Sequence, residues 1–240
     1  TKVCLAIAGP GVQGGRVVDD FTCLPDLAPT FLEAGNVDVP KVMSARSLWP
    51  VLKSKKQGQV DKTRDAAITG RERHVHTARP GYLPYPQRSI RTKDYQFIIN
   101  FKPDRWPLGD PYRLDGDNEP SYSLLENRTF VTLADEDAGP TKAWIVTNRN
   151  DPKVNPIYKA VYGKRPKEEL YDLKKDPDQM DNLANNPKHA QTVKKLRQRL
   201  MKYLRETNDP RLIDDGKFFE TPPMAGVVKN QRTIEQAIAD

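Results

Sequence analysis

Residues 24–35 of the chain are Leu24-Pro25-Asp26-Leu27-Ala28-Pro29-Thr30-Phe31-Leu32-Glu33-Ala34-Gly35, and they predict the passage from a strand into a helix. Pro29 suits the first turn of a helix, where its missing N–H costs little, and Gly35 suits the left-handed residue that ends one. Apolar residues recur at helical spacing, at Phe21, Leu24, Leu27, Phe31 and Leu32. From the residues alone, this stretch is a buried connector between a strand and the surface.

Apolar runs on either side of this stretch predict two buried strands. The run at residues 3–8 is continuous, as expected of a strand covered on both faces, and Gly9-Pro10-Gly11 ends it. The run at residues 66–70 predicts the second strand. Cys4 and Cys23 are too few for a disulfide framework or a metal site, so we expect two buried thiols.

Charged and imidazole side chains follow the second run directly, as Arg71-Glu72-Arg73-His74-Val75-His76. Functional groups in open α/β sheets gather at the carboxyl ends of strands, so this is the place where we expect a site. A solvated loop of mixed charge is the alternative, and the residues leave both open. His74 and His76 point to opposite sides of an extended backbone, so we expect no shared metal ion.

The second half of the chain predicts further strands and helices. Residues 85–101 have the pattern of a hairpin that turns at Thr92-Lys93-Asp94. Trp106 lies in a proline-rich loop, where it either packs or binds a ligand. Further predicted elements are helices at 142–148 and 151–163, a strand at 168–173 and a helix at 187–206 capped by Asn186. An irregular tail beyond Arg211 is expected to wrap back on the surface.

Composition predicts a loop-rich globular protein that attracts anions. The chain has 21 prolines, and its 39 Lys and Arg against 32 Asp and Glu give a net charge of +7. Nucleic acid and sulfated polysaccharide are both candidates. The charges are interleaved along the chain, and no RNA-binding, zinc-ligand or helix-turn-helix pattern is present, so we expect no nucleic-acid partner. No apolar run is long enough to predict a membrane span, and the first residues predict a strand rather than a signal peptide.

Several blocks of the sequence resemble one family, the type I sulfatases, in the same order. Residues 24–35 with Val39-Pro40 resemble the segment that follows the core strand beyond the catalytic centre. Later blocks resemble the heparan N-sulfatase-like branch, and the likeness covers residues 1–215. These blocks are Gly70-Arg71-Glu72-Arg73-His74, residues 85–92, residues 101–107, residues 165–173 and residues 176–184.

The resemblance implies an α/β fold, namely the C-terminal part of an alkaline-phosphatase-like sulfatase fold. We expect the last strands of the large sheet, and a small antiparallel sheet packed on a C-terminal helix. Residues 1–78 would end the large catalytic domain, residues 79–215 would form a C-terminal α+β subdomain, and residues 216–240 an irregular tail.

The resemblance also implies hydrolysis of sulfate esters or sulfamates on sulfated glycans such as heparan-type saccharides. Such enzymes use a formylglycine, made from a Cys or Ser with Pro two residues on and Arg four residues on, and a divalent cation that suits Ca²⁺. Cys23 has Pro25 but Leu27 in place of the arginine, so we reject it as the nucleophile. We therefore expect no catalytic or metal-binding residue in this chain, both lying before Thr1, and no activity or cofactor binding by the chain alone.

The contribution expected of this chain is the far wall of the substrate pocket, with Glu72, Arg73 and His74 as substrate-binding residues. Arg73 would pair with an anionic group through two hydrogen bonds, and His74 would donate to a sugar hydroxyl or a sulfate oxygen. The implied partners are a sulfated carbohydrate and the N-terminal part of the sulfatase, in the periplasm, a lysosome or outside the cell. Two alternatives stay open: a non-catalytic module for anionic polysaccharide, and a phosphoester or phosphonate hydrolase of the alkaline phosphatase superfamily.

Overall fold

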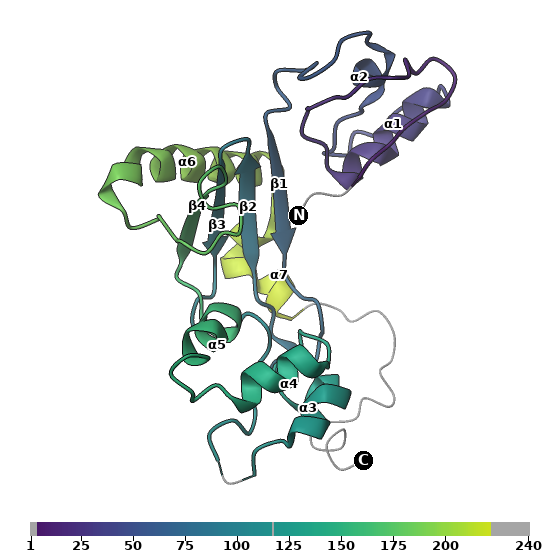
Figure 1. Ribbon diagram of the computed structural model, residues 1–240. Helices are drawn as coiled ribbons and strands as arrows, with labels where there is room; N and C mark the ends of the chain where they lie inside the picture. Colours follow the sequence, from purple (N-terminus) through teal and green to yellow (C-terminus); the bar gives the residue numbers. More distant parts are fainter. Residues whose placement is uncertain (1–3, 117, 222–240) are drawn as a thin grey trace. The chain divides into compact units, whose positions relative to one another are not determined.

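The computed structural model describes residues 4–116 and 118–221 of the chain. The chain divides into two compact units, one made of residues 1–68 and 90–95 and the other of residues 69–89 and 96–240 (Figure 1). Each unit is described below by itself.

The first unit contains the predicted helix α1, Leu27–Ala34, which follows a 3-10 turn, η1, at Leu24–Asp26. The helix ends where expected, because the Gly35 N–H donates to Phe31 O at 3.0 Å. The left-handed residue is Asn36, with φ 55°, and not Gly35. The prediction of a buried apolar face was wrong: Leu24 and Phe31 are 69% and 64% exposed.

Hydrogen-bonded polar side chains, rather than an apolar stripe, fix α1 in this unit. The Thr30 hydroxyl donates to Asp26 O at 2.6 Å and accepts from the N–H of Leu48 at 2.7 Å, just before helix α2 at Trp49–Lys53. Asp26 is buried and accepts from the Arg64 guanidinium at 2.9 Å. A buried charge is tolerated only when it is paired, and the Asp26 carboxylate is paired with Arg64.

Residues 4–8 do not form the strand that the apolar run predicts, and Cys4 is exposed. A strand exists only where a neighbour accepts and donates its backbone hydrogen bonds, and no described residue pairs with this segment. The expectation of two buried thiols therefore fails for Cys4. Cys23 is half-buried, with Sγ 4.0 Å from Ile68 O.

A four-stranded antiparallel sheet contains β1 (Ala66–Arg71), β2 (Gln87–Thr92), β3 (Tyr95–Asn100) and β4 (Glu168–Asp172), in the order β1-β2-β3-β4 (Figure 1). This confirms the small antiparallel sheet, the hairpin with its turn at residues 92–94 and the later strand. The run at residues 66–70 is a strand, but its residues are half-buried or exposed rather than buried. It is an edge strand of this small sheet.

Helix α6, Ala190–Glu206, is the C-terminal helix that the sequence predicts beside the small sheet (Figure 1). A 3-10 turn, η4 at Pro187–His189, precedes it, and Asn186 Oδ1 accepts from the N–H of Lys188 at 3.0 Å. Its Arg197 forms an ion pair with Glu168 at the start of β4. Its buried face consists of Val193, Leu196, Leu200 and Leu204.

Further short helices belong to the second unit. They are α3 (Tyr122–Asn127), α4 (Pro140–Thr147), α5 (Asn155–Tyr162) and α7 (Lys217–Glu220), with 3-10 turns η2 (Pro80–Tyr82), η3 (Thr129–Val131), η5 (Pro210–Leu212) and η6 (Asp214–Gly216). The core between α3, α4 and α5 includes Leu125, Val131, Val146 and Tyr162. Residues 222–240 of the expected tail lie outside the described residues. Among the described residues, no helix combines the length and the apolar character that crossing a membrane requires.

Candidate functional site

The predicted substrate-binding residues, Glu72, Arg73 and His74, follow β1 directly and are called here the 72–74 segment. Backbone hydrogen bonds hold its start, since Glu72 O accepts from the N–H of Tyr85 at 2.7 Å. The three side chains have different surroundings. The three residues are consecutive in the sequence, but each side chain has its own set of partners.

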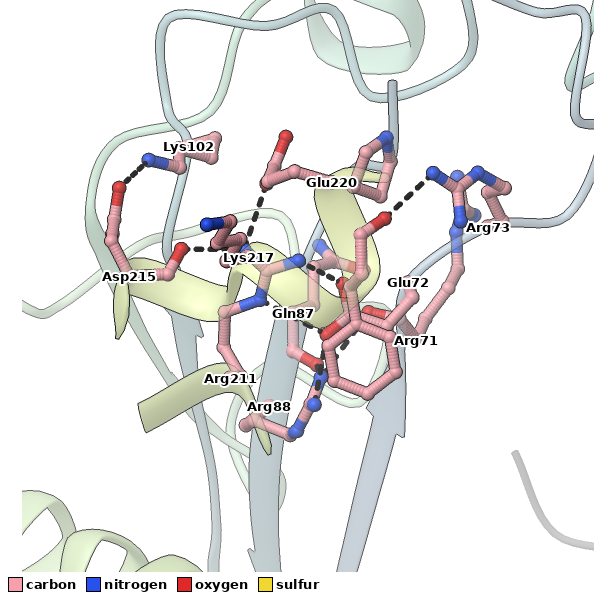
Figure 2. A network of polar contacts seen from close by, with 12 residues as sticks. Arg71, Glu72, Arg73, Gln87, Arg88, Lys102, Arg211, Asp215, Lys217 and Glu220 are labelled. Carbon is pink, nitrogen blue, oxygen red and sulfur yellow. Dashed lines mark hydrogen bonds and ion pairs between the residues drawn. The ribbon is translucent and has the colours of Figure 1, made fainter. Parts of the chain in front are cut away.

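The Glu72 carboxylate is held by two arginines from distant parts of the sequence (Figure 2). Arg88 Nη2 lies 2.8 Å from Glu72 Oε1, and Arg211 donates to both carboxylate oxygens. Both guanidinium groups are buried, with side-chain exposures of 7% for Arg88 and 0% for Arg211. Glu72 therefore has its charge compensated inside the protein.

The two arginines extend these contacts into what we call the Glu72 network. Arg88 donates to Asp209 at 2.6 and 2.8 Å, Arg211 donates to Glu220 at 2.8 Å, and Arg105 donates to Glu220 at 2.7 Å. The Phe219 ring centroid lies 5.7 Å from the Arg88 guanidinium carbon and 5.4 Å from that of Arg211. Three carboxylates face three guanidinium groups, so the network carries no excess charge for an anionic ligand.

Arg73 uses one edge of its guanidinium on the backbone. Nε donates to Tyr82 O and Nη2 donates to Phe219 O, each at 2.7 Å. Partial burial lowers the pKa of Arg73, against the opposing effect of Glu72. The Nε and Nη2 edge expected to bind an anion through two hydrogen bonds is therefore occupied, and only Nη1 lacks a partner among the described residues.

His74 is the exposed member of the segment, with 64% of its side chain accessible. Its Nδ1 lies 3.9 Å from Oδ1 of Asp135, whose side chain is fully buried. The opposite ring nitrogen has no partner among the described residues. His74 thus lies near a carboxylate, is open to solvent, and can donate or accept a hydrogen bond through its ring nitrogens.

Asp135 organises the backbone behind His74, and sequence reasoning missed it. It accepts from Arg79 Nη2 at 2.8 Å, from Arg71 Nη2 at 3.2 Å and from the N–H of Val75 at 2.8 Å. Both arginines also donate to Pro107 O, at 2.7 and 2.9 Å. No sequence signal separates Asp135 from its acidic neighbours Glu136 and Asp137, because burial alone distinguishes it.

The described residues do not fit the calcium ion or the formylglycine of the sulfatases. In residues 4–116 and 118–221, no group of three or more His, Cys, Asp or Glu could hold a metal ion. The carboxylates nearest the 72–74 segment, Glu72 and Asp135, are already bound by arginines. Burial, and then Asp26, raise the pKa of the Cys23 thiol, which disfavours its thiolate form.

Comparison with known proteins gives relatives along most of the chain. Human N-sulphoglucosamine sulphohydrolase is 28% identical over 209 residues, which are 82% of this chain and 34% of that protein. An ulvan-active sulfatase of Formosa agariphila is 24% identical over 203 residues, covering 82% of this chain and 32% of that protein. The relatives of this chain are sulfatases. The resemblance seen in the sequence is therefore confirmed, and the chain spans about a third of the length of these sulfatases.

A shorter stretch and several solved structures are also similar. The extracellular sulfatase SULF-1 homolog of Drosophila melanogaster is 40% identical over 67 residues, covering 28% of this chain and 6% of that protein. A solved 2-O GAG sulfatase matches with a TM-score of 0.48 and 21% identity, over 85% of this chain and 29% of its own. BT4656, solved with its substrate D-glucosamine-2-N,6-O-disulfate, matches with a TM-score of 0.43 and 21% identity, over 79% of this chain and 25% of its own. No family model matches the chain.

Proposed function

We propose that this chain is the C-terminal part of a sulfatase that hydrolyses sulfate esters or sulfamates on sulfated glycans such as heparan-type saccharides. The observation that carries the proposal is the similarity to N-sulphoglucosamine sulphohydrolase over 209 residues. The net charge of +7 suits an anionic substrate. The nucleophile and the cation would come from the part of the parent enzyme outside this chain, so the 240 residues alone would be inactive.

The proposed contribution of this chain is one wall of the substrate pocket, built on the 72–74 segment. His74 would contact the substrate, because its ring is exposed and one nitrogen is without a partner among the described residues. Glu72 and Arg73 would fix the position of the segment, since the Glu72 carboxylate and one edge of the Arg73 guanidinium are bound within the protein. The Arg73 Nη1 group is left to face an anion.

The first unit would dock on the part of the sulfatase that precedes it. This unit exposes a series of apolar side chains, namely Leu5, Val17, Leu24, Phe31, Val37 and Val42. Exposed apolar groups gathered in a small unit are typical of a surface that another part covers. The division at residues 78 and 215, the alkaline-phosphatase-like architecture of the parent and a periplasmic, secreted or lysosomal location belong to the same proposal.

The proposal is tested by extending the gene upstream and purifying the full-length protein beside the 240-residue chain. Sulfate release from heparin-derived disaccharides, with N-sulfate and O-sulfate positions assayed separately, should occur with the full-length protein and require a divalent cation. The 240-residue chain should release none. Metal-dependent turnover by the 240-residue chain alone would contradict the proposed division of labour.

The same assay separates the other two hypotheses. A full-length protein that binds heparin but releases no sulfate would be a non-catalytic polysaccharide-binding module. One that hydrolyses phosphoesters or phosphonates in preference to sulfates would belong with the phosphoester hydrolases. Replacing Phe31 by Asp should lower the yield of folded full-length enzyme but leave the helix content of the 240-residue chain unchanged, if the apolar face of the first unit docks as proposed.

A further inference from the structure

A cavity of about 280 Å³ lies in the second unit, apart from the side chains of the 72–74 segment. Its apolar walls are Trp106, Pro111, Leu114 and Tyr158, and its polar walls include Asp115 and Asn150. Aromatic and apolar surface combined with a few polar groups is the usual composition of a small-molecule site. The question is which ligand suits these walls.

The backbone that carries Trp106 is fixed by hydrogen bonds from two arginines. The Trp106 backbone O accepts from Arg79 Nε at 2.8 Å, and the next carbonyl, of Pro107, accepts from Arg71 and Arg79. The Lys164 ammonium lies 5.3 Å from the Trp106 ring centroid. An indole on this backbone offers an apolar platform beside a positive charge.

The polar groups of the cavity are free to bind a ligand. The Asp115 carboxylate, the Asn150 amide and the Tyr158 hydroxyl have no hydrogen-bond or ion-pair partner within residues 4–116 and 118–221. The Arg149 guanidinium is different, because it donates to Val146 O at 3.0 Å, to Leu114 O and to Glu119. Arg149 is therefore engaged within the wall, while the other three lining residues offer acceptors and donors to a ligand.

We infer that this cavity is a binding subsite for one pyranose ring of an anionic glycan. The ring's C–H face would lie on Trp106, its hydroxyl groups would bond to Asn150 and Asp115, and a sulfate or carboxylate on the ring would lie by Lys164. The chemistry of the walls matches each part of such a sugar, which has an apolar face, hydroxyl edges and a negative charge.

The subsite would recognise a sugar other than the one that reacts. Arg71 and Arg79 link the two places, because they bind Asp135 behind His74 and also the carbonyls of residues 106 and 107. The inference rests on the proposed function for the identity of the glycan. It assigns to the cavity a role in binding longer chains, whereas the 72–74 segment of the same unit would face the reacting group.

Titration of the 240-residue chain with a heparin-derived hexasaccharide by calorimetry tests the subsite. Trp106→Ala should weaken binding by about fivefold or more, because a stacked aromatic is worth about 1 kcal/mol or more. Trp144→Ala is the matched control, since Trp144 is 48% exposed on α4 and should leave the affinity unchanged. Equal affinities of Trp106→Ala and the unsubstituted chain would overturn the inference.

Recognition of the sulfate charge by Lys164 is tested with the desulfated hexasaccharide as a second probe. Lys164→Gln should weaken binding of the sulfated probe and leave that of the desulfated one unchanged, whereas Lys159→Gln, on exposed α5, should change neither. If Trp106→Ala unfolds, as judged by circular dichroism, two other variants replace it. Trp106→Phe should retain binding, and Asn150→Ala, at an exposed residue, should reduce it. If Lys159→Gln weakens binding as much as Lys164→Gln does, the charge effect is not specific to the cavity and the subsite is contradicted.

These binding measurements stand apart from the proposed activity. If the full-length protein releases sulfate and Trp106→Ala changes neither binding nor the KM for hexasaccharide, the subsite is wrong and the sulfatase function stands. If the chain binds through Trp106 but the full-length protein releases no sulfate, the proposed function is wrong and the subsite stands. With both correct, Trp106→Ala raises the KM for hexasaccharide and leaves kcat on a monosaccharide unchanged.

Discussion

Arg211 donates hydrogen bonds to both carboxylate oxygens of Glu72, although 139 residues separate the two in the sequence. The Nε to Oε1 distance is 3.2 Å, and the Arg211 side chain is fully buried. This pair joins the segment after β1 to the residues that follow α6 (Figure 2). The position of the 72–74 segment therefore depends on the C-terminal part of the chain.

Replacing Arg211 by Met should destabilise the second unit by about 3 kcal/mol, since removing one partner of a buried ion pair leaves the others uncompensated. Glu72 and Glu220 would each lose one of their arginines. The urea midpoint of the 240-residue chain measures the effect. The control Arg205→Met, on the exposed end of α6, should change stability by less than about 0.5 kcal/mol. Equal midpoints for the two variants would refute a structural role for Arg211.

Acid should weaken the Glu72 network through Asp209. Burial on its own raises the pKa of Asp209, but hydrogen bonds from Arg88 and the N–H of Arg211 outweigh it, so the pKa lies below its usual value. The stabilisation is then fully present above the unfolded pKa of about 4 and is lost as the pH falls through the folded pKa. Urea unfolding from pH 7 to pH 2.5 should show Asp209→Asn less stable than the unsubstituted chain at pH 7, with a gap that closes in acid.

The exposed Asp178→Asn is the control for this series, and it should follow the unsubstituted chain at every pH. A gap between Asp209→Asn and the unsubstituted chain that stays constant from pH 7 to pH 2.5 would show that the ionisation of Asp209 does not contribute.

Gly109 should tolerate no side chain. Its φ is +93°, and a Cβ there would lie 2.7 Å from the N atom of Ala134 and 3.1 Å from Ala78 O. The N–H of Asp135 donates to the carbonyl of Leu108, the residue before Gly109, at 3.0 Å, so the clash would move Asp135 as well. Gly109→Ala should cost about 2 kcal/mol in stability, measured by thermal unfolding. Gly116→Ala, which meets no atom within 4 Å, should be near neutral, and a similar loss there would contradict this account.

His74 should affect turnover of the full-length enzyme rather than its stability. His74→Ala should lower kcat/KM on sulfated disaccharides by about tenfold or more, the effect of losing a hydrogen bond to a charged group. Its side chain is 64% exposed, so the melting temperature should change little. His189→Ala, at the start of α6, is the control. An unchanged kcat/KM and pH profile for His74→Ala would remove His74 from the site.

Local patterns predicted the hairpin and the C-terminal helix. The turn at residues 92–94 falls between β2 and the β-branched and aromatic strand β3, and Asn186 with Pro187 marks the start of α6. These features succeed because hairpin turns and helix caps depend on residues close in sequence. The failures at residues 4–8 and on α1 concern burial, which depends on what covers a segment and not on its own residues.

The sequence by itself determined the likeness to sulfatases, the hairpin, the C-terminal helix and the place of the 72–74 segment after a strand. Only the tertiary structure decided that Glu72 is bound by Arg88 and Arg211, that Arg73 holds backbone carbonyls, and that Asp135 lies behind His74. The physical reason is that charge pairs such as Arg79 with Asp135 and Arg211 with Glu72, which lie 56 and 139 residues apart, follow from how the chain packs. A carboxylate in the sequence carries no mark of its partner.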